Sequence, residues 1–231
     1  MKIKFNVIVL SLFISILSPG AFAQGEIQDL MLNCDGGNVI ACFNLGNKYY
    51  DGESAKQDYF KANELYQKAC DGEHMSACFN LGYSYYNGEG TKQDYFKAND
   101  FFQKACDGGH MSACFNLGYS YFNGEGAKQD YFKANKLYQK ACNGGDMLAC
   151  SNLGNNYSNG KGIKQDYFKA NELYQKACDG GNMSACNSLG FNYANGNALK
   201  QDYSQAKILF RIACDGRVKV ACENYRILNK K

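Results

Sequence analysis

The sequence predicts an all-α fold, a solenoid of helix pairs, and three observations support this class. The segments 81–116 and 117–152 are almost identical, which defines a repeat of 36 residues. Each repeat holds two stretches whose apolar residues recur at helical spacing, and the 12 cysteines fall in pairs with the same period. Self-similarity at such a period is typical of solenoids. We therefore expect one repeat domain over residues 24–231 rather than two unlike domains.

The first helix of a repeat is predicted over residues 75–86. Its small and apolar residues lie at the spacing of one helical face. They are Ala77, Cys78, Leu81, Gly82 and Tyr85. The segment 87–90, Asn-Gly-Glu-Gly, ends the helix, because Asn and Gly favour the backbone conformations that close one.

The second helix begins after Asp94, whose carboxylate can accept hydrogen bonds from the free backbone N–H groups at a helix start. Its apolar side is predicted to consist of Phe96, Ala98, Phe101, Phe102 and Ala105. The segment 107–109, Asp-Gly-Gly, ends this helix. The sequence contains one proline, Pro19, so no proline interrupts these repeats.

Each turn between a second helix and the next first helix is flanked by two cysteines eight positions apart. The pairs are Cys34–Cys42, Cys70–Cys78, Cys106–Cys114, Cys142–Cys150, Cys178–Cys186 and Cys214–Cys222. In one continuous helix their Cα atoms would be about 12 Å apart, whereas a disulfide needs about 4.4–6.8 Å. A turn that folds the chain back removes this conflict, so we predict a disulfide across each antiparallel helix hairpin. Each bridge is expected to contribute roughly 2.5 kcal/mol.

Metal binding is the alternative role for the cysteines. Zinc sites usually use thiols about two to four residues apart, and here seven residues separate the members of each pair. Two histidines, His74 and His110, occupy equivalent positions of neighbouring repeats, and without an acidic partner they are expected to be exposed loop-end residues. We therefore predict no metal and no other cofactor.

The first 23 residues have the layout of a secretory signal peptide. Lys2 and Lys4 precede an apolar run, and residues 21–23, Ala-Phe-Ala, provide a small-residue cleavage site. The run is shorter than the roughly 20 residues of a membrane span, and a retained anchor is the alternative. Cleavage would leave Gln24 first and lower the formal charge from +3 to +1, because two lysines and no acids are removed.

Export has consequences for the thiols and for the partners. Thiols that can reach one another oxidise outside the cytosol, and an even number of regularly spaced cysteines is typical of a disulfide framework. A near-neutral chain lacks the basic field that holds nucleic acid. We expect a secreted or periplasmic monomer with no nucleic-acid partner and no membrane contact after cleavage.

The two ends of the array are expected to be capping units. Residues 26–34 look like a lone second helix, and residues 218–229 look like a lone first helix. The second loop glycine, Gly90 in the central repeats, is replaced by Ser54 near the start and by Ala198 near the end. Terminal repeats of solenoids are usually atypical. The sequence thus predicts about twelve helices in six bridged hairpins.

Each repeat carries a specific pattern of small, aromatic and polar residues. The positions are Leu81-Gly82, Tyr86, Gly88, Gly90, Gln93-Asp94, Ala98, Lys104-Ala105 and Gly108. This pattern resembles the Sel-one-like repeat, a relative of the tetratricopeptide repeat, and the added cysteine pairs and leader are similar to the Helicobacter cysteine-rich proteins. The resemblance implies a right-handed superhelix of disulfide-bridged αα-hairpins. It also implies penicillin binding with slow β-lactamase hydrolysis for the narrower group, and protein–protein scaffolding for the broader family.

The motifs of a serine β-lactamase are incomplete in this chain. Such enzymes use Ser-x-x-Lys, Ser-Asp-Asn and Lys-Thr-Gly elements, and only the first occurs, at Ser158 to Lys161 and at Ser204 to Lys207. We expect Ser158 in a loop and Ser204 at a solvated helix start, and we interpret both matches as coincidental. Oxidised cysteines cannot act as nucleophiles. Catalytic residues are therefore unassigned, and hydrolysis is implied by the resemblance alone.

A row of asparagines on the first helices is the candidate ligand site. In solenoids one set of helices lines a concave face that binds partners. We expect this face to hold Asn44, Asn80, Asn116 and Asn152, with Tyr83 and Tyr119 beside them. A carboxamide both donates to and accepts from a peptide bond, so the face suits an extended peptide or a peptidoglycan-like chain.

Repeat duplication is the alternative explanation of this row, because copying preserves useful and neutral residues alike. The second-helix asparagines are assigned a structural role, hydrogen bonding between repeats, at Asn63, Asn99, Asn135 and Asn171. Most Tyr and Phe residues are expected to pack in the core. The sequence leaves two functions open, an exported binding scaffold and a weak β-lactamase.

Overall fold

The computed structural model describes residues 19–52 and 56–230, which form twelve α-helices and no strand. In chain order they are α1 (Pro19–Asp35), α2 (Val39–Asp51), α3 (Tyr59–Asp71), α4 (Met75–Asn87), α5 (Tyr95–Asp107), α6 (Met111–Asn123), α7 (Tyr131–Asn143), α8 (Met147–Asn159), α9 (Tyr167–Asp179), α10 (Met183–Asn195), α11 (Tyr203–Asp215) and α12 (Lys219–Asn229). Residues 1–18 lie outside the described residues, and with them most of the predicted signal peptide, so that prediction stays untested.

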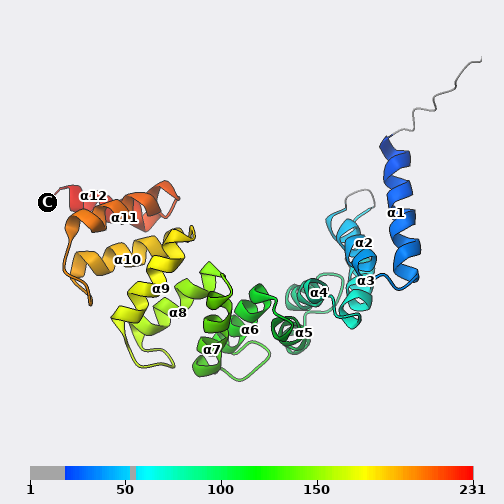
Figure 1. Cartoon of the computed structure of the whole chain (residues 1–231), viewed down its shortest axis with the longest axis horizontal. Helices are drawn as coiled ribbons and strands as arrows, with labels where there is room; N and C mark the ends of the chain where they lie inside the picture. The colour runs from blue at the N-terminus through cyan, green and yellow to red at the C-terminus, as the bar shows by residue number, and fades with distance from the viewer. Residues whose placement is uncertain (1–18, 53–55, 231) are drawn as a thin grey trace, which may run out of the picture.

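The helices stack one after another into an arc (Figure 1), and each packs mainly on its neighbours in the chain. In this view α4 lies toward the inside of the arc and α5 toward the outside. Disulfides join α1 to α2, α3 to α4 and so on along the array. The predicted fold class, an all-α superhelical solenoid of disulfide-bridged hairpins with a repeat of 36 residues, is confirmed.

The helix ends follow the predicted capping residues. Helix α4 extends one residue beyond its predicted end, and α5 begins directly after Asp94. The Asp94 side chain accepts a hydrogen bond from the backbone N–H of Lys97 at 3.1 Å, as expected for an N-cap. Gly88 follows α4 with a φ of 78°, the left-handed conformation that closes many helices.

Each first helix contacts the following second helix closely through a glycine. A Cβ atom at Gly82 would lie 2.8 Å from a ring carbon of Phe102, so only glycine allows this approach. Leu81, Ala98 and Ala105 are buried around the same contact. The layers share one main apolar core, with a smaller cluster of Ala206, Phe210 and Leu228 at the C-terminal end, as expected for stacked repeats that cannot bury their apolar faces alone.

One residue of the predicted apolar side lies outside this core. Phe96 is 71% exposed, so its assignment to the core was wrong. Phe96 is the second residue of α5. Burial by the neighbouring layer begins two residues later, at Ala98. The same position is exposed in the other repeats, at Phe60, Phe132 and Phe168. The core instead takes Phe102 and part of Phe101, which stacks on Tyr85 with ring centroids 5.6 Å apart.

The second-helix asparagines hydrogen-bond between repeats, as predicted. Each donates its side-chain N–H to a backbone carbonyl in the loop after the next first helix. The pairs are Asn63–Glu89, Asn99–Glu125, Asn135–Lys161 and Asn171–Asn197, at 2.7–2.9 Å. Lys104 adds a bond of 2.8 Å from its Nζ to the carbonyl of Cys70 in the preceding unit. These contacts fix each layer on the next.

One buried part of this network differs between the two halves of the array. Asn156 donates its side-chain N–H to Oδ1 of Asn135 at 2.7 Å. At the equivalent position, Ser84 is fully buried, and neither its Oγ nor Oδ1 of Asn63 has a hydrogen-bond partner among the described protein groups. The shorter serine side chain thus leaves two buried polar atoms unpaired.

We expect Ser84→Asn to stabilise the protein by about 1 kcal/mol, because it supplies the missing hydrogen bond to Asn63. The measurement is the free energy of unfolding from a urea titration. Asn156→Ser is the matched reverse change and is expected to destabilise by a similar amount, because it leaves Asn135 unpaired. A loss of stability in Ser84→Asn would contradict this prediction, since it would show that the longer side chain does not fit.

Candidate binding groove

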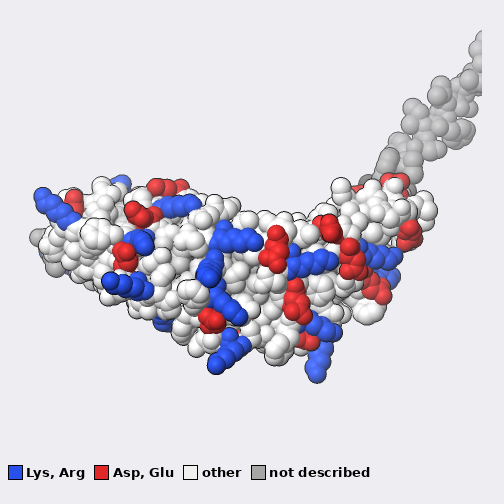
Figure 2. All heavy atoms as spheres, turned by 60° about the horizontal axis from the view of Figure 1, so that its bottom comes forward, with Lys and Arg blue, Asp and Glu red and all other residues white. Residues whose placement is uncertain are grey.

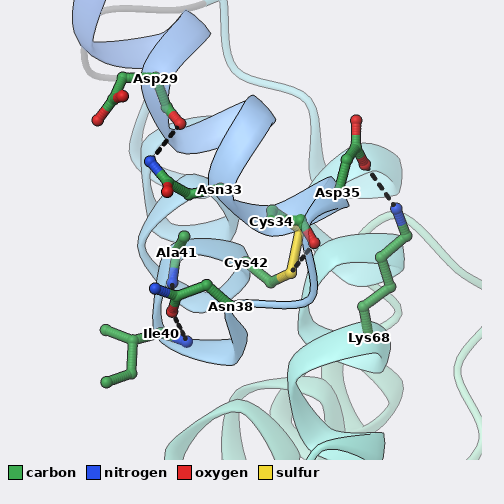
Figure 3. The surroundings of a disulfide bond; sticks show 9 residues. All are labelled: Asp29, Asn33, Cys34, Asp35, Asn38, Ile40, Ala41, Cys42 and Lys68. Carbon is green, nitrogen blue, oxygen red and sulfur yellow. Dashed lines mark hydrogen bonds and ion pairs between the residues drawn. A yellow bond between two sulfur atoms is a disulfide. The ribbon is translucent and has the colours of Figure 1, made fainter.

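Six disulfides hold the helices in pairs, one at each glycine turn, with Cα atoms 4.6–4.7 Å apart. Figure 3 shows the first, between Cys34 near the end of α1 and Cys42 in the first turn of α2. Between them Asn38 caps α2, and its side chain accepts from the N–H groups of Ile40 and Ala41 at 3.1 Å. Every described cysteine is bridged. The bridges therefore fix the start of each first helix.

The two histidines are half-buried against aromatic rings of the preceding first helix, not exposed as predicted. The ring centroids of His74 and Phe43 are 4.3 Å apart. The Nδ1 of His74 accepts a hydrogen bond from the backbone N–H of Ala77 at 3.3 Å, and this bond caps α4. The ring centroids of His110 and Phe79 are 4.5 Å apart, and burial lowers the pKa of His110 below the ordinary value. Among the described residues, no three His, Cys, Asp or Glu side chains are placed to hold a metal ion together.

The two Ser-x-x-Lys matches form no serine–lysine pair. Ser158 lies in the last turn of α8 rather than in a loop, so that placement was wrong. Lys161 places its Nζ 5.1 Å from the ring centre of Phe122. Ser204 is exposed in the first turn of α11, as predicted, with its backbone N–H donated to Asp202. No hydrogen bond joins either serine to a lysine within the part of the chain that the structure describes.

Polar bonds close the junction between α2 and α4. Tyr66 of α3 is buried, and its hydroxyl donates to Oδ1 of Asn47 on α2 at 2.8 Å. Asn80, a member of the predicted row, donates to the same oxygen at 3.4 Å. Burial raises the pKa of Tyr66 far above its ordinary value. Asn80 thus belongs to an internal network as well as to the surface.

Three other junctions are closed in similar ways. Between α8 and α10, the hydroxyl of Tyr174 donates to Asn155 at 2.8 Å. Between α6 and α8, the side chain of Asn152 interacts with the hydroxyl of Tyr138. Burial raises the pKa of both tyrosines. Between α10 and α12, Asn224 donates to an asparagine of α10 at 3.1 Å.

The junction between α4 and α6 is open. The buried second-helix residue here is Phe102, which has no hydroxyl, and the α4 residue equivalent to Asn47 is Tyr83. A cavity of about 220 Å³ lies at this junction, and its lining residues are Tyr83, Tyr86, Phe102, Phe115, Asn116 and Tyr119. The side chain of Asn116 makes no hydrogen bond with any residue that the structure describes.

The structure thus brings three of the predicted site residues together, Asn116, Tyr83 and Tyr119. Asn44 is exposed on α2, where only α1 precedes it, and lies apart from this cavity. The sequence reasoning missed Phe102 because it treated that ring only as core. The signal was present, since Phe102 replaces the tyrosine found at the equivalent position of α3, α7 and α9.

Charged side chains of both signs are interspersed on the outer side of the arc (Figure 2). Several lysines of the protein lie over aromatic rings, as Lys97 does with its Nζ 5.2 Å from the ring centre of Tyr85. This mixture gives no extended field of one sign on the face shown. Within residues 19–52 and 56–230, none of the helices combines the length and apolar character needed to cross a membrane.

The repeat pattern and the stacked, capped helix pairs define the class of this protein. The Sel1 repeat matches five segments of the chain, at residues 39–74, 76–110, 112–146, 148–182 and 184–217. Each segment runs from a first helix through the following second helix to the next turn. The chain belongs to the Sel1 repeat family, which confirms the resemblance in its repeat pattern.

Several solved structures are similar to this chain. A protective antigen of uropathogenic Escherichia coli, c5321, which displays an SLR fold, is 30% identical with a TM-score of 0.83 over 85% of this chain and 42% of that one. A Sel1 repeat protein from Oxalobacter formigenes is 31% identical with a TM-score of 0.75, over 80% and 76%. Helicobacter pylori cysteine rich protein B is 27% identical with a TM-score of 0.48, over 59% and 98%. The chain thus spans less than half of the antigen's length. No curated protein sequence matches it.

Proposed function

We propose that this protein is an exported scaffold that binds an extended polypeptide segment of a partner protein along its first helices. The observation that carries the proposal is a row of exposed aromatic rings beside the asparagine row. Tyr83, Tyr119 and Phe191 occupy equivalent positions and are 43, 41 and 54% exposed. Aromatic rings are the commonest anchors of protein interfaces, and carboxamides can pair with both groups of a peptide bond.

The disulfides support this proposal in a second way. A binding surface that is ordered before the partner arrives loses less conformational entropy on binding. Each bridge joins consecutive helices, so the first helices are held in position independently of any ligand. Scaffolding is also what the resemblance to the broader repeat family implies.

The same bridges indicate an oxidising compartment, periplasmic or extracellular. We propose that residues 1–23 direct the chain there and are then removed. The exported protein should then begin at Gln24 when its N-terminus is sequenced. A mature protein that still begins at Met1 would contradict this part of the proposal.

Selection of short random peptides displayed on phage tests the binding proposal. The oxidised chain is the target, and the reduced, alkylated chain serves for counter-selection. We expect selected peptides to lose affinity by about tenfold or more when Tyr119→Asn and Phe191→Asn are combined, because both anchors are removed. These changes copy Asn155, the natural residue at that position of α8.

Phe96→Ser is the matched control on the outer side, where Ser204 is the natural equivalent. It should leave peptide binding unchanged. Failure to select any peptide would contradict the proposal. Selected peptides whose binding depends on Phe96 and not on the first helices would show that the binding surface lies on the outer side of the arc.

A β-lactam is a different class of ligand, implied by the resemblance to the narrower group and by no arrangement of the described residues. Its test is hydrolysis of a chromogenic cephalosporin by the oxidised chain, followed across a sizing column. Turnover that follows the protein peak and disappears on reduction would establish a β-lactamase. Turnover that separates from the peak would exclude this activity for the chain.

A further inference from the structure

We propose that the open junction between α4 and α6 is a pocket for one neutral apolar side chain of the bound peptide, with Asn116 hydrogen-bonded to the peptide backbone beside it. This inference rests on the proposed function, and it adds which kind of residue the peptide must carry. It also places that residue at one defined step of the array, rather than at every repeat.

The size of the cavity favours a single side chain. Its volume is about 220 Å³, which is below the roughly 300–1,000 Å³ of pockets that enclose whole small-molecule ligands. One aromatic ring or one branched aliphatic side chain fills such a space, while the rest of the ligand stays outside. A chain molecule that extends along the first helices meets this requirement.

The lining determines the chemistry of the side chain. Phe102 forms a buried floor, and Tyr86 is fixed by a hydrogen bond of 2.6 Å from its hydroxyl to Glu125. No charged side chain lines the cavity, so a charged ligand group would lose its hydration without gaining a partner. The pocket therefore selects neutral apolar side chains.

Asn116 supplies an unpaired carboxamide to the lining, beside the hydroxyl groups of Tyr83 and Tyr119, which also make no hydrogen bond with the described residues. Its carboxamide can donate to a peptide carbonyl and accept from a peptide N–H. Its counterparts Asn80 and Asn152 already interact with other side chains of the protein. Asn44 lies apart from the cavity, so Asn116 is the member of the row that is available to hold the backbone next to the inserted side chain.

The protein contains its own closed version of the pocket. In the junction between α2 and α4, Tyr66 is the equivalent of Phe102 and Asn47 is the equivalent of Tyr83. The side chains of Tyr66 and Asn47 form the hydrogen bond that closes that junction. The double variant Phe102→Tyr and Tyr83→Asn copies that arrangement. It should fold with wild-type stability, because it introduces a residue pair that the chain already uses.

N-acetylphenylalanine amide is a suitable probe, since it joins one aromatic side chain to two amide groups. We expect it to shift the side-chain amide resonances of Asn116 in the NMR spectrum in a saturable way, with about tenfold weaker binding for N-acetylalanine amide. N-acetylaspartate amide should bind no better than the alanine probe. The double variant should lose the preference for the aromatic probe, and Phe96→Ser should keep it.

Two results would overturn the pocket. One is the absence of saturable shifts at Asn116, and the other is equal binding of the aromatic probe by the wild type and the double variant. The phage selection separates this failure from failure of the proposed function. If selected peptides bind the first helices without an apolar residue and bind the double variant as well as the wild type, that result would support the scaffold proposal and exclude the pocket. A selection that yields no peptide would contradict both the proposed scaffold function and the proposed peptide ligand of the pocket.

Discussion

Replacement of Cys106 and Cys114 by alanine is expected to lower the free energy of unfolding by about 2.5 kcal/mol. The bridge closes a short loop in the unfolded chain, and the chain-entropy model assigns roughly this value to a loop of that size. The two sulfur atoms are also buried, so their removal adds a smaller packing loss. The measurement is a urea titration monitored by circular dichroism.

Reducing conditions provide the control for this prediction. When all bridges are open, the wild type and the double variant differ only in the packing of the two side chains, so the gap between their stabilities should shrink. Full reduction should also lower the melting temperature of the wild type sharply. Equal stability of the oxidised wild type and the oxidised variant would contradict a stabilising role for the bridge.

Gly126→Ala is expected to cost about 3 kcal/mol or more, for two reasons that add. Gly126 has a φ of 63°, and an L-residue in this left-handed region costs about 1–2 kcal/mol. A Cβ atom there would also lie 2.3 Å from the carbonyl oxygen of Tyr95 in the preceding layer, which is backbone and cannot rotate away. Overpacking of this kind typically adds about 1–3 kcal/mol.

Gly109→Ala separates the two contributions. Gly109 also has a positive φ, of 89°, but no atom lies within 4 Å of a Cβ built there. Its replacement should cost only the conformational part, about 1–2 kcal/mol. Equal losses at Gly109 and Gly126 would show that the contact with Tyr95 does not matter. Ala198 is the natural alanine equivalent to Gly126, with a φ of 53°, so Ala198→Gly should be stabilising.

The repeat period explains why the fold was predictable. The same helix start at Asp94 and the same glycine turn at Gly108 recur in successive units, so local signals could be checked against their copies. The spacing of Cys106 and Cys114 excluded a continuous helix and required the hairpin. Helix ends and disulfide partners depend on short stretches of chain, which sequence patterns capture well.

The site was only partly predictable, because it depends on contacts between layers. Phe96 and Phe102 lie on the same helix and are both apolar, yet one is 71% exposed and the other 1%. Helical spacing separates the two rings, because Phe96 lies about 200° around the helix from Ala98, on the side away from Phe102 and Ala105. Grouping both rings by their apolar character alone missed this difference. The role of Asn116 is hidden in the sequence, since Asn80 and Asn152 look identical to it. Only the partners supplied by neighbouring helices distinguish the three.

The placement of the bridges also determines how the protein tolerates cutting. The turn at residues 107–109 is exposed and glycine-rich, as are its equivalents, and such turns are the preferred sites of proteolytic cleavage. Each of these turns lies inside the loop that a disulfide closes. A single cut there would leave the two fragments covalently joined and their helices in contact. In a protease-rich environment, a single cut at one of these exposed turns therefore does not divide the molecule.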